Sequence, residues 1–199
     1  KAGVKVTTMA NHRVKDTALF DKIVATISKS GPLSLASYIN HALSDPEYGY
    51  YQTRDPFGIV GDFITAPEIS GLFGEMCGLY LAHFVRLSGL RDPAIFELGP
   101  GRGSLILDMR RVWRHIMPSL TTAPVHLLET SPPLRCIQQD RLSDVTLFFH
   151  ENLDHLPAQP LFAIANEFFD ALPVAQAIFR QNKNDAGGIW RHRLVGLID

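Results

Sequence analysis

The sequence predicts an α/β protein with a doubly wound, mostly parallel sheet. A short apolar run at residues 95–98 leads into a glycine-rich turn, and an amphipathic helical pattern follows from Leu105 to Ile116. Two further apolar runs end in polar residues, at Glu129 and at Asn166. Strands that alternate with helical patterns are typical of parallel sheets whose strands are connected by helices.

The chain before this core begins with two predicted helices. Apolar side chains repeat with helical spacing over residues 17–30, and Gly31-Pro32 should end that helix. Ser34 is placed to cap a second helix, which should end just before Pro46.

A third and longer helix is predicted to begin near Thr65. Thr65 and Glu68 have the spacing of a capping box, Pro67 is acceptable in a first turn, and Gly89 is placed to end the helix. The apolar face of this helix, which we expect to be buried, consists of Leu72, Phe73, Met76, Cys77, Tyr80, Leu81, Phe84 and Val85.

The second half of the chain adds three strands and a hairpin. The strands are predicted at residues 125–129, 145–150 and 161–165. Ser131 should cap the intervening helix, with Pro132 at its first position. Strand-like runs at residues 174–179 and 189–197 flank a segment rich in asparagine and glycine, a pattern typical of a β-hairpin insertion. The count is about six strands, two of them in the hairpin.

Composition indicates one soluble globular unit. With 199 residues, 46% hydrophobic and 20% charged, the chain can bury a sizeable core. We expect an N-terminal helical and lid segment, residues 1–90, packed on a core at residues 91–199.

The net charge of -1 gives no general reason to expect nucleic acid as a partner, and no apolar run is long enough to span a membrane. Two cysteines, Cys77 and Cys136, are too few for a disulfide framework and favour a reducing compartment.

The first fifteen residues are basic, but they lack the apolar block of a secretory signal. Their basic side chains are Lys1, Lys5, Arg13 and Lys15. Such a segment fits either the remnant of an organellar transit peptide or a bacterial N-terminus. We favour the bacterial interpretation, which implies a cytoplasmic protein, and expect the mitochondrial matrix if the source is eukaryotic.

The glycine-rich turn favours a cationic ligand over a dinucleotide. It contains three alternating glycines, Gly99, Gly101 and Gly103, which can adopt positive φ and let backbone amides approach a ligand at a helix N-terminus. A dinucleotide loop would place its last glycine at position 104, where Ser104 stands, and Pro100 removes an amide that a pyrophosphate would use. Glu97 would repel a diphosphate and attract an ammonium or sulfonium group. S-adenosylmethionine carries both cations, and the turn resembles motif I of the class I methyltransferases.

A second acid is placed to contact the ribose of this donor. Glu129 ends the next strand, and a carboxylate there can accept both ribose hydroxyl protons. A solvated acid at a strand end is the competing interpretation. Asn152 and Leu153 follow the third strand and are expected to border the adenine. The predicted donor-binding residues are Glu97, Gly99, Gly101, Gly103, Ser104, Glu129, Asn152, Leu153 and Asn166.

Four ordered motifs together resemble the MidA-like methyltransferases. They are residues 45–51 (DPEYGYY), 61–70 (GDFITAPEIS), 97–104 (ELGPGRGS) and 166–173 (NEFFDALP). The resemblance runs from about Pro32 to the end of the chain. It implies a class I methyltransferase-like Rossmann fold, and the family's eukaryotic members are mitochondrial complex I assembly factors that methylate protein arginine. Family members continue well past this point and the class I sheet has seven strands, so we expect the C-terminal part of the fold to be missing here.

The resemblance implies in-line transfer of a sulfonium methyl group, catalysed by positioning and desolvation. An arginine acceptor is cationic, so carboxylates are needed to orient it, and the candidates are Glu167, Asp170 and Asp62. Asn166 would suit an amide or amine acceptor instead, and helix capping is an equal alternative for Asp170. We expect a protein substrate, S-adenosylmethionine as cofactor and no metal. The oligomeric state is not predicted.

Residues 48–68 are expected to fold over the donor as a lid. Their aromatic side chains are too many for an exposed loop, and their glycines would let part of the segment open for ligand exchange. Asp62 would then lie near Glu97 or the transferred methyl group. The alternative is that the aromatic rings pack on a separate helical layer, which would leave Asp62 at the surface.

Two other classes of protein remain open at this stage. A non-catalytic assembly or chaperone protein could keep the fold and bind partners through the aromatic loop. A dinucleotide-dependent oxidoreductase would share the sheet, but Glu97, Pro100 and Ser104 argue against it.

Overall fold

Four parallel strands form the centre of the structure, a computed structural model that describes residues 17–53, 64–181 and 187–197. The helices are α1 (Ala18–Ser30), α2 (Leu35–Ser44), α3 (Tyr50–Thr53), α4 (Ala66–Ile69), α5 (Gly71–Ser88), α6 (Ser104–Ile116), α7 (Pro118–Thr121), α8 (Pro132–Arg141) and the 3-10 turn η1 (Phe169–Ala171). The strands are β1 (Leu33–Ser34), β2 (Ala94–Leu98), β3 (Val125–Leu128), β4 (Leu147–His150), β5 (Leu161–Ala165), β6 (Ala177–Gln181), β7 (Gly188–His192) and β8 (Leu194–Val195). None of the described helices combines the length and the apolar character needed to cross a membrane.

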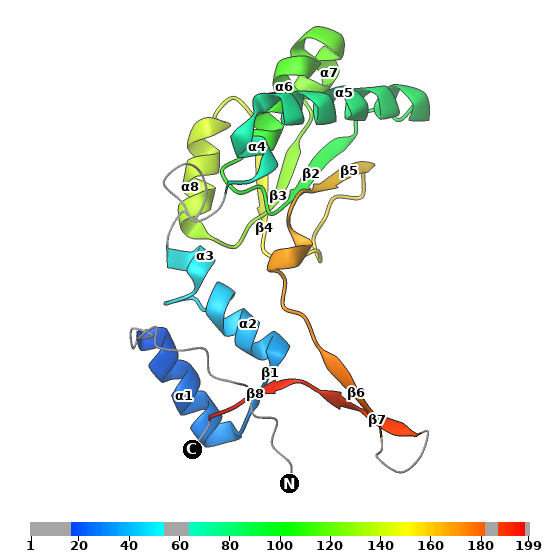
Figure 1. The fold of residues 1–199 in the computed structure, drawn as a ribbon. Helices are drawn as coiled ribbons and strands as arrows, with labels where there is room; N and C mark the ends of the chain where they lie inside the picture. The colour runs from blue at the N-terminus through cyan, green and yellow to red at the C-terminus, as the bar shows by residue number, and fades with distance from the viewer. Residues whose placement is uncertain (1–16, 54–63, 182–186, 198–199) are drawn as a thin grey trace.

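The order of the parallel strands is β4-β3-β2-β5 (Figure 1). From β2 the chain adds β3 and β4 on one side of the sheet and then returns to add β5 on the other side of β2, so the strand order reverses beside β2. Glu97 of β2 lies opposite Leu127 of β3 on one side and Ile164 of β5 on the other. In sheets of this kind ligands bind in the crevice outside the carboxyl ends of the two strands that flank the reversal. The predicted parallel sheet is confirmed, and its reversal point lies between β2 and β5.

The core lies between this sheet and the helix pair α5 and α6. Sheet residues such as Ile95, Val125 and Leu127 are fully buried against α6, whose Met109 and Trp113 are also inaccessible to solvent. The Trp113 indole Nε1 donates a hydrogen bond to the Gly78 carbonyl oxygen of α5 at 2.8 Å. The two helices are therefore fixed to each other by packing and by a buried hydrogen bond.

The buried face of α5 matches the predicted one only in part. The structure buries Leu81 and Val85 as expected, together with the small residues Gly74, Gly78 and Ala82. Of the other large side chains expected inside, Leu72 and Tyr80 are instead 63% and 70% exposed. The helices approach closely at the small residues, because a Cβ on Gly78 would lie 2.8 Å from the Met109 Cα atom. Small residues therefore share with Leu81 and Val85 the buried face of α5.

The predicted capping box of this helix is wrong. Residues 66–69 form the separate short helix α4, and α5 begins at Gly71 with the Ser70 hydroxyl accepting a hydrogen bond from the Leu72 amide at 3.2 Å. The Thr65 side chain makes no capping bond, since the Glu68 amide donates to the Thr65 carbonyl oxygen, and the Glu68 carboxylate accepts from Ser104. The predicted end of the helix is confirmed, since Gly89 has a left-handed conformation with φ 65°.

The other predicted caps have mixed outcomes. Ser34 caps α2 by accepting from the Ser37 amide at 3.0 Å, and Gly31 ends α1, both as expected. Ser131 does stand before Pro132 at the start of α8, but its hydroxyl accepts no capping bond. Its amide instead donates to a Glu129 carboxylate oxygen at 2.8 Å, so Ser131 helps to hold the side chain of the acid that follows β3.

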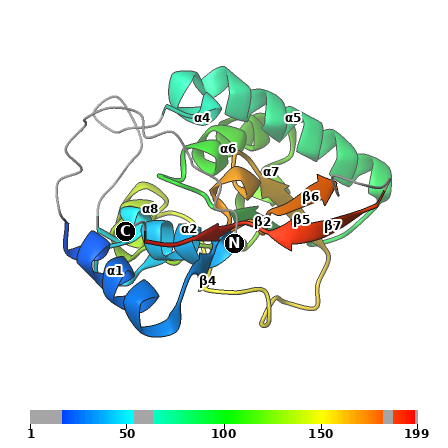
Figure 2. The same ribbon diagram turned by 60° about the horizontal axis from the view of Figure 1, so that its bottom comes forward.

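The remaining strands lie away from the central sheet (Figure 1), and Figure 2 shows the chain after β7 running toward α1 and α2. The predicted hairpin is confirmed as the antiparallel pair β6 and β7. An additional pair, β1 with β8, joins Leu33 to Val195 and was not predicted, because two residues show no strand periodicity. Segments near the two ends of the described chain therefore meet at the same end of the molecule, next to α1 and α2.

The close packing of α5 on α6 generates a stability prediction. Gly78→Ala should lower the free energy of unfolding by about 1 to 3 kcal/mol, because its Cβ has no space against the Met109 backbone. Urea denaturation measures the loss. Gly71→Ala is the matched control in the same helix, since its Cβ would meet only side-chain atoms of Arg111 and Asp108, at 3.2 Å or more. Equal midpoints for the two variants would contradict the packing account.

Candidate functional site

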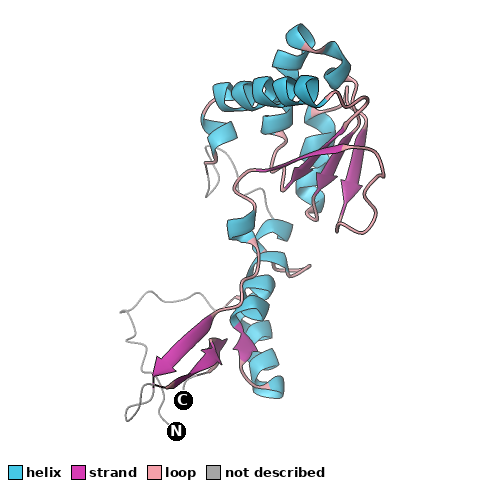
Figure 3. Cartoon of the chain, turned by 90° about the vertical axis from the view of Figure 1, so that its right-hand side faces the viewer, coloured by secondary structure: helices cyan, strands magenta, loops and turns pink. Residues whose placement is uncertain are grey.

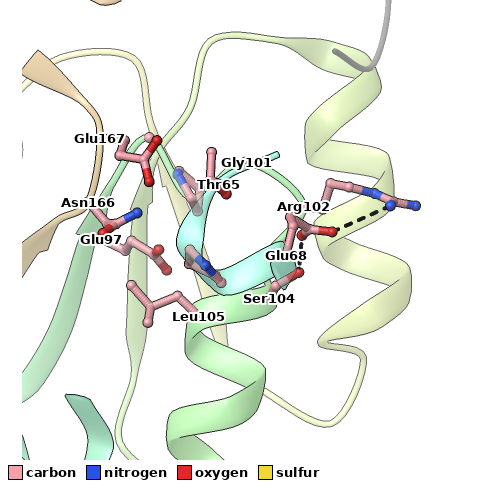
Figure 4. Close-up of a pocket in the computed structure, with 12 residues that line it drawn as sticks. Thr65, Glu68, Glu97, Gly101, Arg102, Ser104, Leu105, Asn166 and Glu167 are labelled. Carbon is pink, nitrogen blue, oxygen red and sulfur yellow. Dashed lines mark hydrogen bonds and ion pairs between the residues drawn. The ribbon is translucent and has the colours of Figure 1, made fainter. Parts of the chain in front are cut away.

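A small cavity of about 50 Å³ occupies the crevice at the reversal point of the sheet. Its walls come from three elements: the turn after β2, the residues after β5 and the short helix α4 (Figure 4). Figure 4 shows Glu97 beside Asn166 and next to Leu105, with Glu167 following Asn166 along the chain and Ser104 at the start of α6. The structure thus brings together Glu97, Gly99, Gly101, Ser104, Asn166 and Glu167, six of the predicted site residues.

Glu97 is the most unusual group in this cavity. Its residue is 2% exposed, and its Oε2 atom is buried without a hydrogen-bond partner. Burial raises the pKa of this carboxyl to about 8. A buried acid without a partner is costly, and a ligand that brings a positive charge or N–H donors would relieve that cost. The cavity therefore favours a cationic group next to Glu97.

The turn that carries this acid requires its glycines. Gly99, Gly101 and Gly103 have φ values of 64°, 54° and 76°, a region that residues with a Cβ seldom adopt. A Cβ on Gly99 would also lie 2.6 Å from the Phe168 ring atom Cδ2. This turn leads directly into α6, so its backbone amides lie at a helix N-terminus, as the sequence predicted.

The short helix α4 closes one side of the cavity through two contacts. At one end the Glu68 carboxylate accepts a hydrogen bond from the Ser104 hydroxyl and lies 3.7 Å from the Arg102 guanidinium. At the other end the Ala66 amide donates to Glu167 Oε1 at 3.2 Å. The helix therefore bridges the turn after β2 and the segment after β5. Arg141 Nη1 also donates to the Ser104 oxygen at 2.9 Å, so the Ser104 hydroxyl, predicted to bind a ligand, has two protein partners.

A second, larger cavity of about 310 Å³ adjoins the first. Gly99, Gly101 and Glu167 line both cavities. Glu129 lines the larger one, as do Tyr51 of α3 and Asn40 of α2, so the N-terminal helices contribute to its wall. The two cavities together form a continuous strip of site residues along the carboxyl ends of β5, β2 and β3.

Glu129 is held in place by its neighbours. The residue is 8% exposed, one carboxylate oxygen accepts from the Ser131 amide, and the other accepts from Gln138 Nε2 at 3.1 Å. Burial raises the pKa of Glu129, and these two hydrogen bonds oppose the rise. The Gln138 amide also donates to the Gly101 carbonyl oxygen at 2.6 Å, which ties the glycine turn to the acid of the next strand.

The other predicted residues are not all brought together. Asn152 accepts a hydrogen bond from the Asp154 amide within its own turn, and Leu153 is 55% exposed. Their neighbour Glu151 lines the larger cavity instead. Asp170 lies exposed in η1, and its charge adds to burial in raising the pKa of Tyr51. Asp62 lies outside the described residues, as does the part of the predicted lid at residues 54–63.

Sequence reasoning missed Gln138, which was given no role in the site. Gln138 carried a signal that could have been used, because it is polar at a position one turn from Leu134, on the buried face of α8. Tyr51 and Glu68 belong to the segment at residues 48–68 that was predicted to cover the donor, and they line the larger and the smaller cavity respectively. The bond between Glu68 and Ser104 was not predicted, because the two residues are far apart in the sequence and no local signal joins them.

Comparisons with known proteins decide the family. The family model described as "Putative S-adenosyl-L-methionine-dependent methyltransferase" matches residues 76–199. The chain belongs to this family. The result agrees with the MidA-like resemblance of the four motifs.

Relatives and solved structures agree with this assignment. "Protein arginine methyltransferase NDUFAF7, mitochondrial" of Danio rerio is 34% identical, covering 90% of this chain and 46% of that protein. The Drosophila melanogaster homolog is 36% identical, covering 79% and 41%. A likely methyl transferase of the COG1565 superfamily from Burkholderia thailandensis, solved with S-adenosyl-homocysteine, has a TM-score of 0.66 at 24% identity, covering 88% of this chain and 49% of that one. It shows the methyltransferase fold. The chain spans about half the length of the curated relatives it matches.

The buried acid generates a prediction about pH. Between pH 4.5 and about 8 the folded protein keeps a proton on Glu97 that the unfolded chain has lost, so this contribution to stability is complete at low pH and falls as pH rises. The expected slope is about 1.4 kcal/mol per pH unit across that window. Urea denaturation of the ligand-free protein at several pH values should show a flatter profile for Glu97→Gln. Asp140→Asn, exposed on α8, is the control, and an unchanged slope in Glu97→Gln would contradict the assignment.

Proposed function

We propose that this chain binds S-adenosylmethionine in the crevice between β2 and β5 and transfers its methyl group to a protein arginine. The observation that carries the donor assignment is the unpartnered, buried Oε2 atom of Glu97 beside three glycines with positive φ. A diphosphate would oppose ionisation of this acid, whereas the donor's ammonium group would favour the ionised carboxylate and compensate its charge. Family membership supports the same donor.

The two cavities fit different parts of the donor. Glu97 would hold the amino-acid portion through the ammonium group, and Glu129 would hold the ribose hydroxyls in the larger cavity. A carboxylate can accept about four hydrogen bonds, and Glu129 uses two of these positions for Ser131 and Gln138, so it can still accept from a diol. The donor supplies an electrophilic methyl group, and the protein supplies position and exclusion of water.

Glu167 is the residue we favour for orienting the acceptor. It lines both cavities and has a left-handed backbone conformation, φ 49°, which is uncommon outside glycine and clusters at functional sites. A guanidinium group does not lose its proton in water, so it needs carboxylates that accept its N–H groups. Asn166 lies beside Glu97 in the same cavity. Asp170 and Asp62 stay as further candidates on sequence grounds.

The acceptor class and the location rest on relatives. Proteins named protein arginine methyltransferase match 79% or more of this chain, which supports an arginine acceptor. Their mitochondrial names support the mitochondrial matrix for a eukaryotic source, and the MidA-like resemblance supports a link to respiratory complex I assembly. A non-catalytic assembly protein with the same fold is the alternative that donor turnover would exclude.

Donor binding is the first test of this proposal. Isothermal titration with S-adenosylmethionine should show that Glu97→Ala and Gly101→Val lose most of the affinity, because one removes the counter-charge and the other obstructs the turn. Glu129→Gln should weaken binding by about 1.5 to 3 kcal/mol, the usual range for a hydrogen bond to a charged group.

Asp140→Ala, an exposed acid outside both cavities, is the control and should bind as the unaltered protein does. Tighter binding of NADH than of S-adenosylmethionine would contradict the donor assignment. Unchanged affinity in Glu129→Gln would place that carboxylate outside the ribose site.

Methyl transfer is the second test. Incubation with methyl-labelled S-adenosylmethionine and a lysate of the source cells, followed by mass spectrometry, should locate the label on arginine of a protein. Glu167→Gln should reduce labelling about tenfold or more with little change in donor affinity, since its carboxylate acts on the acceptor. Label on another residue type would refute the arginine assignment. Donor binding without any label would favour the non-catalytic alternative.

A further inference from the structure

The β6–β7 hairpin is a basic and aromatic element that the proposed reaction does not use. It lies at the opposite end of the molecule from the four-stranded sheet (Figure 3). Nine of its ten strand residues are exposed. Residues 174–197 contain four basic side chains, Lys183, Arg180, Arg191 and Arg193, and one acid, Asp185, in a chain whose net charge is -1. Positive charge is therefore concentrated here.

The register of the hairpin separates two kinds of side chain onto its two faces. Phe179 lies opposite Trp190, and their rings are 5.4 Å apart on one face. The next pairs along the ladder are Arg180 with Ile189 and Ile178 with Arg191, and they lie on the other face because side chains alternate. Arg193 belongs to this second face as well, since its amide bonds the Gln176 carbonyl oxygen at 2.8 Å and so continues the ladder. One face is thus aromatic, and the other carries three arginines and two isoleucines.

The aromatic face accounts for the stability of the hairpin. The Phe179 ring lies over Gly188, where an added Cβ would be 2.5 Å from the ring atom Cζ. Cross-strand aromatic pairs stabilise a sheet, and a hairpin of two strands needs such support. The arginine face contributes no comparable contact. Among residues 17–53, 64–181 and 187–197, no ion pair compensates Arg180, Arg191 or Arg193.

We propose that the arginine face of the hairpin, formed by Ile178, Arg180, Ile189, Arg191 and Arg193, docks an acidic protein surface. On this face β6 presents Ile178 and then Arg180, and β7 presents Ile189 followed by Arg191 and Arg193. An extended segment in which acidic and apolar side chains alternate presents all its carboxylates on one face. Such a segment complements the arginine face, because each guanidinium can donate two hydrogen bonds to one carboxylate. Both strands of the two-stranded sheet also have a free edge in the described structure, where an extended partner can pair.

The separation of the two faces argues against other anionic partners. Single-stranded nucleic acid is bound by aromatic rings and cations that face the same strand, so that bases stack while phosphates are neutralised. A membrane surface likewise contacts tryptophan and basic residues together. Here Trp190 and Phe179 lie on the face opposite the arginines, and a single partner surface cannot contact both. An acidic protein segment needs only the arginine face.

The position of the hairpin indicates what kind of protein this partner is. β6 follows residues 166–173 of the candidate site by only a few residues, yet the hairpin lies at the opposite end of the molecule from the four-stranded sheet (Figure 3). A partner that contacts both must be a macromolecule. We identify it with the methyl acceptor, a step that rests on the proposed function. The docking itself does not depend on methyl transfer.

The test measures binding of a fluorescent peptide of alternating glutamate and valine to the full chain. The triple variant Arg180→Glu, Arg191→Glu and Arg193→Glu should bind at least about tenfold more weakly, which corresponds to a loss of about 1.4 kcal/mol. The variant with glutamine at the same three positions should lose less, because it removes attraction without adding repulsion. Lys29→Glu, Arg86→Glu and Arg91→Glu together are the matched control, with the same change in net charge away from the hairpin, and should retain binding.

Three outcomes would overturn the proposal: no binding of the peptide to the unaltered protein, equal loss in the control variant, or tighter binding of an oligothymidylate or of phosphatidylserine vesicles than of the peptide. Titration with S-adenosylmethionine is run on every variant. If the hairpin variant keeps donor affinity and loses the peptide, docking is supported whatever the fate of the proposed reaction. If the donor does not bind even the unaltered chain, the proposed function fails while the docking result still stands.

Discussion

Burying a carboxyl group without a hydrogen-bond partner costs free energy, and the elements around Glu97 hold it in that state. The acid belongs to a strand with a neighbour on each side, so it cannot move toward solvent without breaking the sheet. The glycine turn brings backbone to it on one side, and α4 covers another. Groups that are this unfavourable in free energy are found mainly at functional sites.

The position of α4 follows from the way α5 packs. Gly74 and Gly78 let α5 approach α6 closely, and the Trp113 indole bonds the Gly78 carbonyl oxygen. The chain enters α5 from α4 through Ser70, so the placement of α5 fixes where α4 lies. Glu68 then reaches Ser104 at the start of α6. The packing of α5 on α6 thus determines the wall that covers Glu97.

The parts of the site that the sequence predicted are those set by local backbone geometry. The three glycines, Glu97 and Glu129 could be placed because a strand end, a turn and a helix start follow one another in the chain. The buried face of α5 was predicted only at Leu81 and Val85, since other large apolar side chains gave a stronger periodic signal than the two glycines that let the helices approach. The break at Ser70 was missed because Thr65 and Glu68 have the spacing of a capping box. In the structure the Glu68 side chain instead bonds Ser104, which is 36 residues away in the sequence.

Acidic side chains predominate in the cavities and arginines on the hairpin, and this difference bears on how an acceptor would be chosen. Glu68, Glu97, Glu129 and Glu167 line the cavities together with Arg102, whereas the described part of the hairpin carries arginines and no acid. A positively charged acceptor side chain is attracted to the cavities and repelled by the hairpin, and an acidic surface experiences the reverse. A protein that carries both an arginine and a separate acidic segment could place the arginine in the cavities and the acidic segment on the hairpin in one orientation. A free arginine or a uniformly basic peptide could occupy only the cavities. Selection of the acceptor would therefore depend on the partner's charge pattern as well as on the fit of its arginine in the cavity.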